Sequence, residues 1–218
     1  MPTLELVRAF EESDKRLPAT ILQPGDTITF FGAKKIYYSN ESFSGMQFNK
    51  LMDPFRVANP CGNTVNPNGD YPTTNLNIPL IRYAEVLLMK AEALIRQGGN
   101  GDAPLNEIRA RAGLPPRRNA TKEDLMNERR CELAGEFSNR MLDLIRRGVA
   151  GKYVEKELHG YKAVPKPGVE IPQSKDDLMI EEVSVWNRRV LNPAVNHVFP
   201  IPANEIAKSR NLVQNKGY

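Results

Sequence analysis

Carboxylates and arginines are concentrated along residues 128–146, and these are the groups in the sequence that could do chemistry. Glu132 and Glu136 stand four residues apart, so a helix would place both side chains on one face. Two carboxylates can serve as the acid and base of a glycoside hydrolase when they lie about 5 Å or about 6.5–9.5 Å apart. That reaction needs the two groups on opposite sides of a sugar, which usually means two different elements.

Arginines three and four residues from these carboxylates favour a structural interpretation. Charges at this spacing form ion pairs along a helix surface. An arginine neighbour also lowers the pKa of a carboxyl group and keeps it ionised, which is wrong for a general acid. We therefore expect an ion-pair network and no catalytic residue. Arg82–Glu85 and Glu92–Arg96 are expected to pair in the same way.

Metal and cofactor chemistry has little support in the sequence. The two histidines, His159 and His197, are distant in sequence from the two cysteines, Cys61 and Cys131, and no zinc-ligand spacing occurs. Neither a glycine-rich phosphate loop nor a metalloprotease motif is found. We expect no metal and no cofactor, and we expect both cysteines to be free thiols.

Sugar binding without chemistry would use aromatic rings in loops, flanked by polar side chains. The candidates for such contacts are Tyr37, Tyr38, Phe43, Tyr71 and Trp186. Tyr37 and Tyr38 are adjacent on a predicted strand, so one should point inward and the other outward. For each aromatic residue, a place in the hydrophobic core stays open as the alternative.

The length and composition fit one domain or one large lobe. The chain has 218 residues, of which 40% are hydrophobic, with 30 basic and 26 acidic side chains. Because the charges are mixed along the helices, we expect no nucleic-acid partner. No apolar run approaches the length of a membrane span, and residues 1–17 lack the apolar core of a signal peptide. We expect no export signal in this chain.

The elements that would position these residues fall into three parts. Residues 1–77 are predicted to form a loop-rich lobe, 78–148 a helical part, and 149–218 a mixed C-terminal segment. The expected helices cover 3–11, 78–97, 102–112, 122–147 and 203–208, and the expected strands cover 27–31 and 36–38. In the second helix Pro79 suits the first turn, and the predicted buried face comprises Leu80, Tyr83, Ala84, Leu87, Ala91 and Leu94. Asp102 is the predicted N-cap of the third helix, and Gly113 is its predicted end. Thr121 and Asp124 predict a capping box at the start of the fourth helix, and Gly135 is a weak point where that helix could break.

The helices at 78–97 and 102–112 form a hairpin like one tetratricopeptide unit. A single unit cannot bury its apolar faces, and three or more normally stack. We therefore expect a further packing partner, which could be the helix at 122–147, another stretch of chain or another protein.

Four segments in this order resemble the C-terminal half of the SusD/RagB family. They cover residues 81–93, 105–114, 128–144 and 199–218. The residues that carry the family's fold signature are Arg82, Glu85, Glu92, Arg109, Glu128, Arg129, Glu132, Glu136, Arg140 and Asp143.

The resemblance implies a mainly α-helical fold with tetratricopeptide-like repeats and an irregular lobe containing a few short strands. It implies a non-catalytic, starch- or glycan-binding lipoprotein on the outer-membrane surface, which takes an oligosaccharide or other nutrient ligand. It implies a TonB-dependent transporter of the SusC type as partner. The family's N-terminal repeats, lipoprotein signal and lipid anchor, its one membrane contact, are expected to be missing here. The alternative is a truncated soluble helical-repeat module that binds a protein partner and no sugar.

Overall fold

The computed structural model describes residues 1–30, 33–39, 42–50, 79–136, 140–187, 189–192, 195 and 198–217. It divides into two compact units, Met1–Ser138 with Leu158–Val185, and Asn139–Glu157 with Trp186–Tyr218. About 38% of the chain is helical and 16% is strand, so the predicted mainly α-helical fold is confirmed. The three-part division at residues 77 and 148 remains a prediction.

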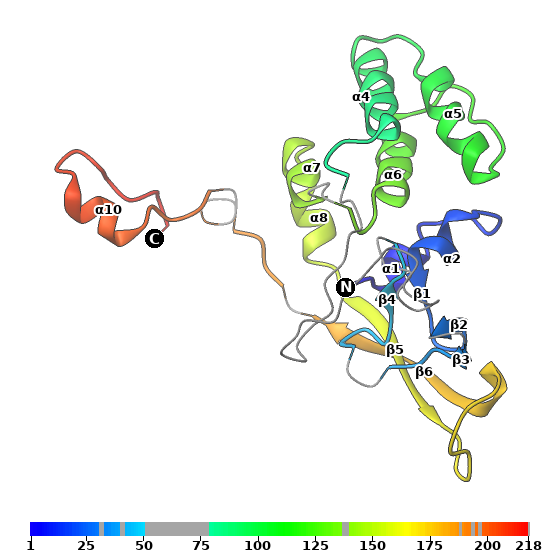
Figure 1. The fold of residues 1–218 in the computed structure, drawn as a ribbon. Helices are drawn as coiled ribbons and strands as arrows, with labels where there is room; N and C mark the ends of the chain where they lie inside the picture. The colour runs from blue at the N-terminus through cyan, green and yellow to red at the C-terminus, as the bar shows by residue number, and fades with distance from the viewer. Residues whose placement is uncertain are drawn as a thin grey trace, which may run out of the picture. The chain divides into compact units, whose positions relative to one another are not determined.

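Most of the described elements lie in the first unit (Figure 1). Its helices are α1 (Leu4–Val7), α2 (Arg16–Thr20), α4 (Tyr83–Arg96), α5 (Asp102–Ala112) and α6 (Lys122–Glu132), with a short 3-10 turn at Lys175–Asp177. Among its described residues, three two-stranded sheets pair β1 (Ile21–Leu22) with β4 (Gln47–Phe48), β2 (Thr27–Phe30) with β3 (Ala33–Ile36), and β5 (Leu158–Pro165) with β6 (Leu178–Trp186).

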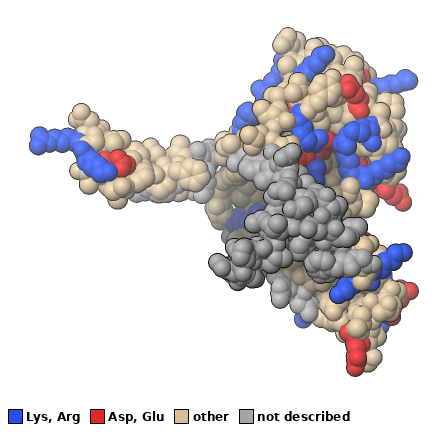
Figure 2. Space-filling view, viewed as in Figure 1, with Lys and Arg blue, Asp and Glu red and all other residues tan. Residues whose placement is uncertain are grey.

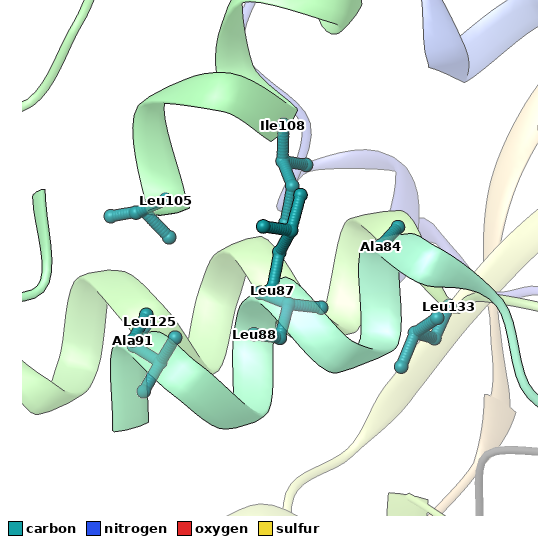
Figure 3. Packing of buried hydrophobic residues seen from close by; sticks show 8 residues of the cluster. All are labelled: Ala84, Leu87, Leu88, Ala91, Leu105, Ile108, Leu125 and Leu133. Atoms are coloured by element: carbon teal, nitrogen blue, oxygen red, sulfur yellow. The ribbon is translucent and has the colours of Figure 1, made fainter. Parts of the chain in front are cut away.

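Helices α4, α5 and α6 pack around one hydrophobic core (Figure 3). Ala84, Leu87, Leu88 and Ala91 of α4 meet side chains from both of the other helices. The partner that the hairpin needs is therefore provided in this chain by α6, one of the expected possibilities. A second cluster holds α1 against β1 and the end of α6 through Leu4, Phe10, Ile21, Met46 and Cys131.

Helix α4 begins later than predicted, at Tyr83, with Arg82 as its N-cap. Pro79 therefore lies outside the first turn, and the prediction for it was wrong. Leu80 and Tyr83 were assigned to the buried face, but they are 73% and 67% exposed. The face that packs is rotated toward Ala84, Leu88 and Ala91, because α5 and α6 both contact it there.

The predicted helix at 122–147 is broken. Helix α6 ends at Glu132, and α7 begins at Arg140 in the second unit. Gly135 has a φ of +76°, which is outside the α-helical region and is open mainly to glycine. The predicted capping box at the start of α6 is confirmed, since Thr121 and Asp124 exchange side-chain and backbone hydrogen bonds.

Asp102 does not cap α5 as predicted, because Gly101 is the N-cap. Its carboxylate instead accepts hydrogen bonds from the backbone N–H groups of Asn119 and Ala120, both at 2.8 Å. Asp102 thus holds the α5–α6 connection against the start of α5. At the other end of α5, Gly113 has a φ of +78° and ends the helix as expected.

Strands β5 and β6 were missed by the sequence reasoning, which saw only mixed structure there. β6 contains the adjacent pair Glu181–Glu182, which interrupts the alternation that marks a half-buried strand. β5 contains Gly160 at a buried position, where a side chain would meet the backbone of Ser44. The second unit contains α7 (Arg140–Arg146), α8 (Ala150–Val154) and α10 (Ala203–Lys208), and α10 lies where a short helix was predicted.

Candidate functional site

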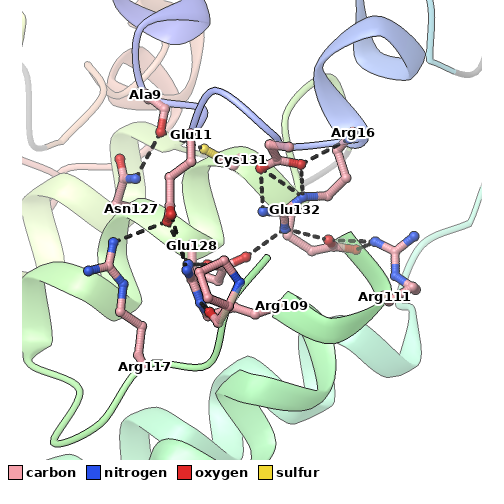
Figure 4. Close-up of polar contacts among 12 residues, drawn as sticks. Ala9, Glu11, Arg16, Arg109, Arg111, Arg117, Asn127, Glu128, Cys131 and Glu132 are labelled. Atoms are coloured by element: carbon pink, nitrogen blue, oxygen red, sulfur yellow. Dashed lines mark hydrogen bonds and ion pairs between the residues drawn. The ribbon is translucent and has the colours of Figure 1, made fainter. Parts of the chain in front are cut away.

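Glu132, the last residue of α6, is the centre of a buried ion-pair network. Its side chain is 0% exposed, and three arginines from three different parts of the chain reach it. Arg16 lies 3.0 Å away, Arg82 2.9 Å and Arg111 2.6 Å, measured between nitrogen and carboxylate oxygen. Figure 4 shows Arg16 and Arg111 approaching this carboxylate from different elements. The network thus joins α2, α5 and the N-cap of α4 to the end of α6.

Glu128, one turn earlier on α6, extends the network toward α5 and the N-terminal residues. Arg109 Nη1 donates to Glu128 Oε2 at 2.9 Å and to Glu11 Oε1 at 2.7 Å (Figure 4). Arg16 Nη1 lies 2.6 Å from Glu128 Oε1, in an ion pair whose angle is not that of a hydrogen bond. Arg16 also binds Asp14, with 2.7 Å between Nη2 and Oδ2.

Glu136 joins residues from either side of segment 51–78. Arg82, four residues after the segment, donates to it through Nε and Nη2, both at 2.7 Å. Lys50, immediately before the segment, forms an ion pair with the same carboxylate and donates to the backbone oxygen of Glu132 at 2.6 Å. We call Lys50, Arg82 and Glu136 the clasp.

The network keeps its carboxylates ionised. Burial alone would raise the pKa of Glu132, but hydrogen bonds from Arg16 and Arg82 and the charge of Arg111 hold it below its usual range. Burial likewise opposes a lowered pKa at Glu136, and Arg82 and Lys50 outweigh it. At Lys50, by contrast, burial prevails over its ion pair and lowers the pKa. A carboxylate with a depressed pKa is a poor general acid, so this geometry suits structure and not glycoside hydrolysis.

The ion pairs differ from the predicted helix-surface pattern. Arg82 was expected to pair with Glu85, but it binds Glu132 and Glu136, while Glu85 binds Arg129 at 2.8 Å. The reason is that Arg82 precedes α4, so it is not held at helical spacing from Glu85. The predicted Glu92–Arg96 pair is confirmed at 2.9 Å.

Arg140 and Asp143, the remaining fold-signature residues, belong to the second unit. Asp143 is 3.2 Å from Arg146, and Arg140 stacks over Tyr153. The sequence reasoning missed Asp14, Arg16, Lys50 and Arg111. Arg16 and Glu132 are 116 positions apart, and no local spacing signals such a contact.

The aromatic candidates for sugar contact lie in different environments. Tyr37 is 7% exposed, so its ring belongs to the core, and Tyr38 is half-buried. Phe43, in the first unit, is 54% exposed, and Trp186, in the second unit, is 50% exposed. Tyr71 lies outside the described residues. Phe43 and Trp186 are therefore the candidates whose rings are accessible.

The two residue types that most often bind metals have structural partners where they are described. Cys131 is a free thiol whose pKa burial raises to about 12, and His159 Nδ1 lies 2.7 Å from a carboxylate oxygen of Glu5. Cys61 and His197 lie outside the described residues. Within the described part of the chain, no group of three or more potential ligands could hold a metal ion. No helix in that part is long and apolar enough to cross a membrane.

Comparison with known proteins now identifies the family. Residues 5–218 match the SusD family. The chain belongs to the SusD family. One curated member, the starch-binding protein SusD of Bacteroides thetaiotaomicron, is 32% identical over 149 residues, which cover 68% of this chain and 22% of the relative.

Solved SusD-like structures share the fold. A SusD-like protein from Bacteroides fragilis matches all of this chain with a TM-score of 0.76 and 24% identity. Surface glycan-binding protein A from Bacteroides thetaiotaomicron, in complex with laminarihexaose, matches 98% of the chain with a TM-score of 0.59 and 21% identity. These matches cover 47% and 40% of the two solved chains, so the present chain spans less than half their length.

Proposed function

We propose that this chain is part of a non-catalytic glycan-binding protein that acts at the outer-membrane surface with a TonB-dependent transporter of the SusC type. The observation that carries the proposal is the 32% identity to a starch-binding protein over 68% of this chain. A similar solved protein holds laminarihexaose, which is consistent with a glycan ligand.

The geometry supports binding without turnover. The two carboxylates that could have formed an acid–base pair are held ionised by arginines and lysine inside the protein. Glu132 has no exposed side-chain surface through which a sugar could reach it. The accessible rings of Phe43 and Trp186 are the ligand contacts that we propose within the described residues, since an aromatic face can stack on the apolar face of a pyranose.

The test is calorimetric titration of the full-length protein containing this chain with maltohexaose and laminarihexaose. We expect binding of at least one glycan without release of reducing ends. Trp186→Ala or Phe43→Ala should weaken it by about fivefold, because one aromatic contact contributes about 0.5–1.5 kcal/mol. Tyr83→Ala is the matched control, since Tyr83 is an exposed aromatic on α4 that we do not assign to binding.

Two outcomes would contradict the proposal. Release of reducing ends would show hydrolysis, and no retention on any of a broad glycan panel would exclude glycan binding. The transporter is tested separately by purifying the tagged protein from mildly solubilised outer membranes. Co-purification of a TonB-dependent barrel is expected, and its absence under conditions that preserve other membrane complexes would remove the partner from the proposal.

A further inference from the structure

The second unit carries a strong positive charge that the whole-chain value hides. Its residues, 139–157 and 186–218, contain ten Lys and Arg against four Asp and Glu, a net charge of +6. The first unit contains 20 Lys and Arg against 22 Asp and Glu, a net charge of −2. On the face of the first unit seen in Figure 2, basic and acidic side chains are interspersed. Only the second unit has the charge imbalance that attracts an anionic ligand.

Three cations of the second unit surround one aromatic ring. The Tyr153 ring centroid lies 5.4 Å from the Arg140 guanidinium carbon, 5.7 Å from Lys152 Nζ and 5.8 Å from Lys156 Nζ. Lys152 lies on α8, Lys156 follows that helix by two residues, and both are exposed. We call these four residues the Tyr153 cluster.

The ammonium groups of the two lysines in the cluster are available to bind an anionic ligand. In the part of the chain that the structure describes, neither ammonium group forms an ion pair with a carboxylate. Glu155, between them, accepts a hydrogen bond from the backbone N–H of Leu191 at 3.1 Å. The electron-rich face of Tyr153 offsets part of the repulsion among the three cations. An anionic group bound between the three cations would offset more of their mutual repulsion.

A second aromatic residue, Trp186, is connected to the cluster through a nearby arginine. Arg189 Nη2 donates to the backbone oxygen of Lys156 at 2.8 Å, which fastens the segment after β6 to the end of α8. Trp186, 50% exposed, lies three residues before Arg189. The unit therefore combines unpaired lysines with an accessible ring, and an acidic sugar offers both an anionic group and an apolar ring face.

We propose that the Tyr153 cluster binds the carboxylate or sulfate group of an acidic saccharide. This inference rests on the proposed glycan-binding function and names the ligand class for it. Lys152 and Lys156 provide the charge that binds the anionic group, and Tyr153 keeps these two lysines and the Arg140 guanidinium together.

The experiment compares two probes on the full-length protein by calorimetry, a hexagalacturonate and its fully methyl-esterified form. The two share one sugar backbone, and the ester replaces each carboxylate by an uncharged methyl ester. We expect the acid to bind at least tenfold more tightly than the ester at low salt and to weaken as salt is added. Lys152→Gln with Lys156→Gln should remove about tenfold of the acid's affinity and leave the ester unchanged, because the double substitution removes two positive charges. Lys90→Gln with Lys162→Gln, two exposed lysines of the first unit, is the matched control.

Four results would overturn the inference. Binding of maltohexaose or laminarihexaose without any preference for the acid would reject the acidic ligand while leaving glycan binding intact. Equal loss of acid affinity in the control pair would show a general charge effect. Lysine-dependent binding to phosphatidylglycerol vesicles, with hexagalacturonate unaffected by the same substitutions, would assign the cluster to an anionic lipid surface. Failure to bind any saccharide would reject the proposed function together with this inference.

Discussion

Glu132 shows how one buried carboxylate can organise a fold. Three arginines from separate elements converge on it, and its own side chain is closed to solvent. Such a network is weak evidence of net stabilisation, because each charge loses its hydration on burial. Removing one member of the network has a much larger effect on stability, because its partners then keep buried charges that no opposite charge compensates.

Glu132→Gln should therefore be strongly destabilising. We expect a loss of about 3–5 kcal/mol in the free energy of unfolding, measured by urea titration followed by circular dichroism. Glu123→Gln is the control, because Glu123 lies on the same helix and is exposed. Equal midpoints for the two variants would show that the network does not hold the fold.

The same carboxylates should make stability depend on pH. The pKa values of Glu11, Glu132 and Glu136 are all lowered in the folded protein. A group with a depressed folded pKa stabilises the protein above its unfolded value, about 4.3 for Glu, and this contribution is lost as pH falls through the folded pKa. The urea midpoint should be flat from pH 7 to about 5 and fall below it, less steeply in Glu136→Gln. A midpoint that rises on acidification would contradict this assignment.

At the scale of elements, Gly135 separates the end of α6 from α7. A Cβ atom there would lie 2.9 Å from Phe48 Cδ1, and the backbone has a φ of +76°. Gly135→Ala should cost about 1–3 kcal/mol, which thermal unfolding would detect. Gly151→Ala is the matched control, since Gly151 lies within α8 with open space around it, and alanine favours a helix by about 1 kcal/mol. A similar loss in both variants would mean that the conformation of Gly135 is not what matters.

Elements with local signals were predictable, and those set by distant contacts were not. Thr121, Gly113 and the buried positions Ala84, Leu87 and Ala91 of α4 follow local patterns of a few residues, so the sequence displays them. The first residue of α4 depends on Arg82, which is drawn out of the helix by Glu132 and Glu136 some 50 positions later. β6 pairs with β5 despite its broken alternation, because hydrogen bonding across the sheet replaces the missing local pattern.

In the candidate site, too, local spacing was predictive and contacts between distant residues were not. Residues 128–136 could be identified as a structural ion-pair network from arginine spacing, although the actual partners could not. The accessibility of Phe43 and Trp186, and the burial of Tyr37, depend on packing that no short motif encodes. The Tyr153 cluster went unnoticed because Arg140 lies thirteen positions before the ring.

At the scale of the whole molecule, the two units differ in how much core they bury. Among the described residues, both hydrophobic clusters lie in the first unit, whereas α10 in the second has no buried residue. Local stability should differ accordingly. In hydrogen exchange followed by mass spectrometry, we expect amides of 105–112 to exchange only through global unfolding, and amides of 203–208 through local opening. Equal protection of the two peptides would contradict this difference.

The clasp has a consequence for how members of such a fold could diverge. Lys50 and Arg82 bind the same Glu136 carboxylate, so two residues that are 32 positions apart in the sequence are held at one point of the fold. Related proteins that keep Lys50, Arg82 and Glu136 would keep this joint even where the sequence between positions 50 and 82 differs in length and composition.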